Sequence, residues 1–138
     1  MKIILQVFLT LLFLGSVSFG NEFRDMKQIS LKKDSQRKIL VKYGKYKRLF
    51  KFRWTLYIND TLVIFSSYDR NVAQHIMSLN HKNQSFRVEL KPRGADDFNV
   101  PYLLVKFKEF NYKKNEAVFE IYLWDKKMQI ALEYLKDN

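Results

Sequence analysis

The sequence predicts an all-β protein, an antiparallel meander of about seven short strands that forms a sandwich or a small barrel. Two observations lead to this prediction. Apolar and polar side chains alternate with period two from Leu49 onward, which is typical of strands that bury one face. Short connections containing Asn or Asp separate the apolar runs, as they do in chains of hairpins.

The first twenty residues have the pattern of a secretion signal. Lys2 precedes an apolar run from Ile3 to Leu14, and Ser18 and Gly20 place small residues before a cleavage point at Asn21. We therefore expect residues 1–20 to be a cleaved signal peptide and the protein to be exported to the periplasm. Two alternatives stay open. An uncleaved segment 1–20 would anchor the chain in the inner membrane. In the other alternative, the exported protein is secreted from the cell.

The rest of the chain has the length of one domain. We expect residues 21–45 to be a basic, partly flexible leader and residues 46–138 to be a single antiparallel β domain. The sequence has no cysteine, which excludes disulfides, a lipid-attachment cysteine and thiolate metal sites.

The first hairpin has the clearest pattern. Large apolar residues alternate with polar ones, and Asn59-Asp60 then offers a two-residue turn that needs positive φ. The alternating apolar residues are Phe50, Phe52, Trp54, Leu56 and Ile58. In this register Leu56 lies opposite Val63 and Trp54 lies opposite Phe65, which would keep large apolar side chains on one face.

Three later connections each end in Asn, which tolerates the left-handed conformation of a three-residue hairpin loop. They are 69–71, 81–83 and 113–115. We therefore expect strands at 72–79, 84–91, 102–111, 115–124 and 128–136. Segment 115–124 is apolar on both faces and should be central in its sheet. Segments 70–79 and 128–136 also fit a short helix, and this alternative stays open.

The basic segment is the strongest functional signal. Residues 27–53 contain eleven basic residues and one acid, and part of this segment interleaves cations with aromatic residues. The candidate contacts to an anionic surface or a partner are Lys42, Lys45, Lys47, Arg48, Lys51 and Arg53. Export makes nucleic acid an unexpected partner, so we expect an anionic envelope component or another envelope protein, with peripheral membrane contact. The competing interpretation is a solvated strand face.

Other candidate sites are weaker. The 91–101 connection brings Arg93 near Asp96 and Asp97 in sequence, but two carboxylates fall short of the ligands that calcium takes. His75 and His81 lack zinc-site spacing, and no nucleophile elbow surrounds a serine. We therefore expect no cofactor, no metal and no enzymatic activity.

The signal peptide, the basic leader and the hairpin together resemble small uncharacterised periplasmic proteins of AT-rich Gram-negative bacteria. The resemblance is one of general character, covers the chain loosely and implies no site residue. The hairpin sequence that contributes to it is Phe50-Lys51-Phe52-Arg53-Trp54-Thr55-Leu56-Tyr57.

The sequence leaves three hypotheses for function. A non-enzymatic envelope binding module predicts that the basic residues gather on one face of the domain. A small-ligand carrier predicts an apolar cavity of about 300–1,000 Å³. An enzyme predicts that His75 or His81 meets a serine and an acid.

Overall fold

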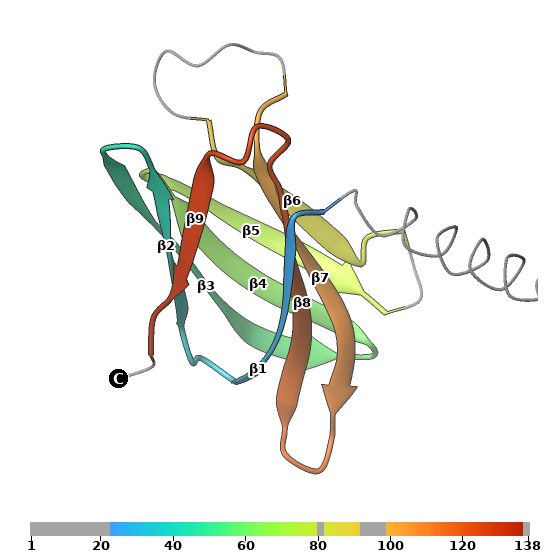
Figure 1. Cartoon of the computed structure of the whole chain (residues 1–138). Helices are drawn as coiled ribbons and strands as arrows, with labels where there is room; N and C mark the ends of the chain where they lie inside the picture. The colour runs from blue at the N-terminus through green and yellow to red at the C-terminus, as the bar shows by residue number, and fades with distance from the viewer. Residues whose placement is uncertain (1–22, 80–81, 92–98, 137–138) are drawn as a thin grey trace, which may run out of the picture.

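The computed structural model describes residues 23–79, 82–91 and 99–136, and within them the chain forms nine antiparallel strands in two packed sheets (Figure 1). The four-stranded sheet has the order β1 (Asp25–Lys32), β8 (Glu116–Trp124), β7 (Tyr102–Asn111) and β6 (Ser85–Glu89). The five-stranded sheet has the order β5 (Asn71–Ser78), β4 (Thr61–Tyr68), β3 (Tyr46–Ile58), β2 (Arg37–Tyr43) and β9 (Ile130–Tyr134). The all-β prediction is confirmed, and the architecture is the sandwich rather than the barrel.

In place of one meander of about seven strands, the described chain has nine strands, and two runs of them are meanders. Strands β2 to β5 follow one another in one sheet, and β6 to β8 do so in the other. The two end strands exchange layers: β1 pairs with β8, and β9 pairs with β2. Each sheet is therefore completed by a strand from the opposite end of the chain.

The prediction of a flexible leader at residues 21–45 is wrong for most of that segment. It contains β1 and β2, which place Ile29, Leu31, Ile39 and Val41 in the core. Each strand has only two such inward residues, and Lys or Arg side chains occupy neighbouring positions, so the period-two signal is short. The domain therefore begins well before residue 46.

The helix alternatives at 70–79 and 128–136 are wrong, and the strand predictions there are confirmed. All eight residues of β5 pair with β4, and β9 pairs with β2 along its length. Strand β8 is central between β1 and β7, as its two-sided apolar pattern predicts. Even Val118, on its outer face, is only 5% exposed.

A β-bulge changes the predicted register of the first hairpin. Asn59 and Asp60 form the turn with φ of 51° and 61°, and Leu56 lies opposite Val63, as predicted. The pairing shifts between Trp54 and Leu56, so that Trp54 lies opposite Ile64 instead of Phe65. The extra residue of a bulge reverses the facing of the side chains after it. Trp54 is therefore buried, whereas Leu56 is 46% exposed.

The Asn residues expected to close hairpin loops behave differently from one another. Asn115 has φ of 53° in the β7–β8 connection, as predicted. Asn71 instead begins β5, because Asp69 and Arg70 alone form the β4–β5 turn, with φ of 49° and 69°. The expected signal peptide 1–20, His81 and the loop candidates Arg93, Asp96 and Asp97 lie outside the described residues.

Aromatic side chains fill the space between the sheets. Phe50 stacks on Phe52, and Phe52 meets Phe119 of the opposite sheet edge to face, with ring centroids 5.3 Å apart. The Trp54 Nε1–H donates a 2.7 Å hydrogen bond to the Leu31 carbonyl, which ties β3 to β1. Phe107 packs beside Phe119. The core is thus continuous from one layer to the other.

A buried carboxylate fastens the entry of β1 to the β8–β9 connection. The Asp125 side chain is 2% exposed and pairs with Arg24 at 3.0 Å. Its Oδ2 also accepts a 2.6 Å hydrogen bond from the Ile130 amide, and Arg24 donates to the Ile130 carbonyl. These bonds hold the residue before β1 against the connection that leads from β8 to β9.

We predict that Arg24→Gln lowers the free energy of unfolding by about 3 kcal/mol, because it leaves the buried Asp125 carboxylate without its cation. The control is Lys42→Gln, which breaks the exposed pair with Glu133 and should cost less than about 1 kcal/mol. Urea unfolding followed by tryptophan fluorescence measures both. Equal losses in the two variants would contradict the assigned role of the pair.

Candidate basic face

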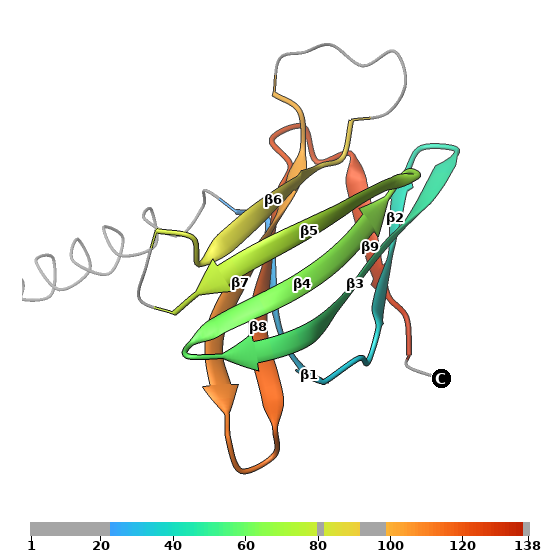
Figure 2. The same ribbon diagram turned by 180° about the vertical axis from the view of Figure 1, so that it is seen from behind.

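Strand alternation sorts the predicted basic residues between the two faces of the five-stranded sheet. Phe50, Phe52 and Trp54 of β3 point into the core, so Lys47, Lys51 and Arg53 point outward. Lys42 of β2 lies opposite Lys47 and shares its face. Figure 2 shows the sheet from this outer side, with β3 and β4 across the view.

Arg48 is separated from these residues. It alternates with Lys47 along β3, its side chain is only 17% exposed, and its guanidinium pairs with the Asp69 carboxylate at the β4–β5 turn. The neighbouring Tyr68 is buried, which raises the pKa of its hydroxyl to about 12. Lys45 lies in the β2–β3 turn and is exposed. Of the six predicted residues, four therefore share the outer face.

Lys38 joins them, although the sequence did not single it out. It lies on β2 directly opposite Lys51, and it alternates with the buried Ile39. Recognising β2 as a strand would have revealed it, because Lys38 and Lys42 are four residues apart and therefore point to the same face of a strand. We call this set the basic face: Lys38, Lys42, Lys47, Lys51 and Arg53.

An acid of the neighbouring strand touches the basic face. The Lys42 ammonium donates a hydrogen bond of 2.8 Å to the Glu133 carboxylate of β9. That hydrogen bond, helped by the charges of Lys42 and Lys47, lowers the pKa of the Glu133 carboxyl. Both partners are substantially exposed, so this pair adds little to stability, and it offsets only one of five positive charges.

The charges on the two sheets are arranged differently. Across the outer face of the four-stranded sheet, Lys32 lies opposite Glu116, and Lys106 lies opposite Glu120. On the basic face, Lys38 lies opposite Lys51, and Lys42 lies opposite Lys47. Opposite charges stabilise a cross-strand pair, and like charges destabilise it. The five-stranded sheet thus retains an electrostatic cost that the other sheet avoids.

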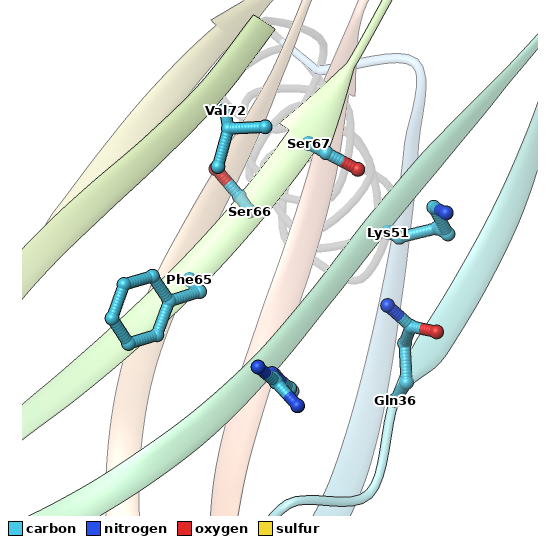
Figure 3. Close-up of a pocket in the computed structure, with 7 residues that line it drawn as sticks. Gln36, Lys51, Phe65, Ser66, Ser67 and Val72 are labelled. Atoms are coloured by element: carbon cyan, nitrogen blue, oxygen red, sulfur yellow. The ribbon is translucent and has the colours of Figure 1, made fainter. Parts of the chain in front are cut away.

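A hollow of about 350 Å³ opens beside the basic face on β3 and β4 (Figure 3). Gln36, from the β1–β2 connection, and Lys51 lie on one side, and Val72 and Phe65 lie on the other. Its polar side chains include the Lys51 ammonium, the Arg53 guanidinium, the Gln36 amide and the Ser67 hydroxyl, and none of its described lining residues carries a carboxylate. The lining residues are Gln36, Lys51, Arg53, Phe65, Ser66, Ser67 and Val72. Such a set of donors suits an anionic group such as a phosphate or a carboxylate.

The hollow lies on the outside of the sandwich, whereas the carrier hypothesis places its cavity between the sheets. There the rings of Phe50, Phe52, Phe107 and Phe119 pack against one another. This packing gives the carrier hypothesis no support.

His75 does meet a serine, but in the interior. Its Nε2 lies 2.9 Å from the Ser66 hydroxyl, and its ring stacks on Phe86 at 3.8 Å. Burial lowers the pKa of His75, and no carboxylate contributes to that shift. Ser66 is only 7% exposed. The pair satisfies a buried hydroxyl, and within the described residues it lacks the acid that a triad requires.

Comparison with protein families, with curated proteins and with solved structures finds no match to this chain. Residues 23–79, 82–91 and 99–136 include no helix that could span a bilayer. The same part of the chain holds no group of three acidic or histidine side chains placed to bind a metal. The basic face is therefore assigned from its own geometry.

We predict that His75 makes the protein less stable in acid. A histidine whose pKa is lowered by folding contributes stability above its ordinary value of 6.5, and this stability is lost as the pH falls through the folded-state value. His75→Gln keeps a hydrogen-bonding partner for Ser66 but does not titrate. Urea unfolding at pH 7.5 and pH 5.5 should therefore show a smaller acid-induced loss in the variant. Identical losses would refute the assignment.

Proposed function

We propose that this protein is a non-enzymatic binding module that docks on an anionic surface of the cell envelope through its basic face. The observation that carries the proposal is the like-charge pairing of Lys38 with Lys51 and of Lys42 with Lys47. A face that served only for solvation would gain from alternating charges, as the other sheet has. An anionic partner removes the repulsion, so binding recovers the cost that the free protein bears.

The magnitude is sufficient for reversible docking. A lysine or arginine near an anionic membrane surface contributes about 1 kcal/mol. If Glu133 offsets one charge, the basic face supplies about 4 kcal/mol, which corresponds to roughly a thousandfold in partitioning. This attraction weakens as salt rises, because exposed charges are screened beyond about 8 Å at physiological ionic strength.

The expected signal peptide makes an envelope anion the natural partner. Outside the inner membrane, such partners include lipid head groups, lipopolysaccharide phosphates and acidic polymers. The open outer face of a sheet also suits an extended surface better than it suits an enclosed small molecule. Nucleic acid would become the leading partner only if the chain stayed in the cytosol.

We predict that neutralising the basic face abolishes binding to anionic vesicles at physiological salt. The test variant replaces Lys38, Lys47, Lys51 and Arg53 with Gln, and co-sedimentation with anionic and neutral vesicles should show a loss of about a hundredfold or more. The control replaces Lys113, Lys114, Lys126 and Lys127 with Gln, at exposed positions in turns outside the sheet faces. It has the same net charge and should bind within about threefold of the native protein, since its basic face is intact.

Circular dichroism of both variants establishes that the fold is retained. An equal loss of binding in the two variants would show that net charge, and not the basic face, causes the attraction. Absence of binding by the native protein at physiological salt would refute the proposal directly.

A further inference from the structure

The outer face of the five-stranded sheet has an exposed apolar region beside the basic face. Leu56, Val63 and Ile76 lie in one row across β3, β4 and β5. Val72 and Ile76 are 76% and 59% exposed. We call this region the apolar strip; its members are Leu56, Val63, Phe65, Val72 and Ile76.

The strands that carry the apolar strip are unusual within this chain. Charged residues make up 28% of the sequence, yet 61–68 and 71–78 contain none. These two stretches are β4 and the edge strand β5. Exposed edge strands are commonly protected by charged side chains, and a contiguous exposed apolar region marks a surface that another molecule covers.

The hollow lies where the apolar strip meets the basic face. Arg53 lies directly opposite Phe65, and Lys51 lies opposite Ser67, which in turn lies opposite Val72. Figure 3 shows Lys51 and Gln36 on one side of the hollow and Phe65 and Val72 on the other. A single occupant of the whole face would therefore join an anionic group to an apolar one.

We infer that this face binds anionic phospholipid in a bilayer, with a lipid phosphate in the hollow and the apolar strip inserted beneath the head groups. The inference rests on the proposed function and specifies its ligand. An acidic polysaccharide would satisfy the basic face but leave Val72 and Ile76 in water. A second copy packed face to face would oppose two sets of cations. Amphipathic helices that combine cations with an apolar face bury that face about 5–10 Å into anionic bilayers, and this sheet face presents the same combination.

The first test measures insertion directly. Ile76→Trp places a fluorophore on the strip without altering the hollow, and Met26→Trp places one at a similarly exposed position on the opposite sheet. Because native Trp54 and Trp124 also emit, the signal is the emission that the variant adds to that of the native protein. With vesicles of phosphatidylglycerol and phosphatidylcholine that carry brominated acyl chains, the emission added by Ile76→Trp should shift to the blue and be quenched at least about twofold. Met26→Trp should show neither, because its sheet faces away from the membrane.

The second test measures the contribution of the strip to affinity. The double variant Val72→Ser and Ile76→Ser should bind these vesicles about tenfold more weakly at physiological salt, because two aliphatic side chains no longer leave water. The control double variant, Met26→Ser and Met128→Ser, removes similarly exposed side chains elsewhere and should bind as the native protein does. Binding to dextran sulfate should be unchanged by Ile76→Ser alone, because Ile76 lies outside the hollow.

The outcomes separate the two proposals. If the charge-neutralised face variant loses vesicle binding while Ile76→Trp is unquenched and the serine variant binds normally, the docking function stands and the lipid inference fails. If dextran sulfate binds the native protein as tightly as the vesicles do, the ligand is a soluble polyanion, and the inference fails. A native dimer that Val72→Ser and Ile76→Ser dissociate would assign the strip to a second copy and overturn it. If charge neutralisation has no effect on vesicle binding, both proposals fail.

Discussion

The alternation of side chains along β3 is the constraint on which the core and the basic face both depend. This strand is thirteen residues long and lies at the centre of the five-stranded sheet. Because successive side chains point to opposite faces, burying Phe50, Phe52 and Trp54 forces Lys51 and Arg53 outward. The neighbouring strand β2 adds its own lysines through its register with β3. One face of β3 thus contributes to the core that stabilises the domain, and the opposite face contributes to the surface proposed to bind.

The bulge after Trp54 changes which residues that pattern exposes. Trp54 remains in the core, where it bonds to the Leu31 carbonyl, but Leu56 turns outward to lie beside Val63. Without the extra residue, Leu56 would continue the buried row, and the outer face would lack one end of its apolar strip. A local irregularity of one residue therefore adds Leu56 to the apolar residues that β4 and β5 already present on the outer face.

The sequence was sufficient for the fold class, the first hairpin turn and the central position of β8, because long, strongly alternating segments specify strands locally. It was insufficient for β1 and β2, whose inward residues number only two each and lie among lysines. It also missed the bulge, since register depends on cross-strand packing that period alone does not encode. Lys47, Lys51 and Arg53 share a face because they alternate with the buried residues of β3, and Lys42 joins them through the pairing of β2 with β3. Arg48 lies at a position of β3 that faces the other way. Lys38 could be found only once residues 37–43 were recognised as a strand.

The two sheets of this molecule differ in how the charges on their outer faces are paired. Both outer faces carry lysines, and the whole chain is rich in lysine, so the presence of lysine alone does not distinguish the two faces. Their pairing does: Lys32 and Lys106 lie opposite glutamates, whereas Lys38 and Lys42 lie opposite lysines. Alternating charges would solvate either face equally well, so the repulsion retained on β2 and β3 is the feature on which the proposed function rests. The proposed anionic partner would supply a compensating gain, and the uncharged strands β4 and β5 lie where the acyl region of an anionic lipid would begin.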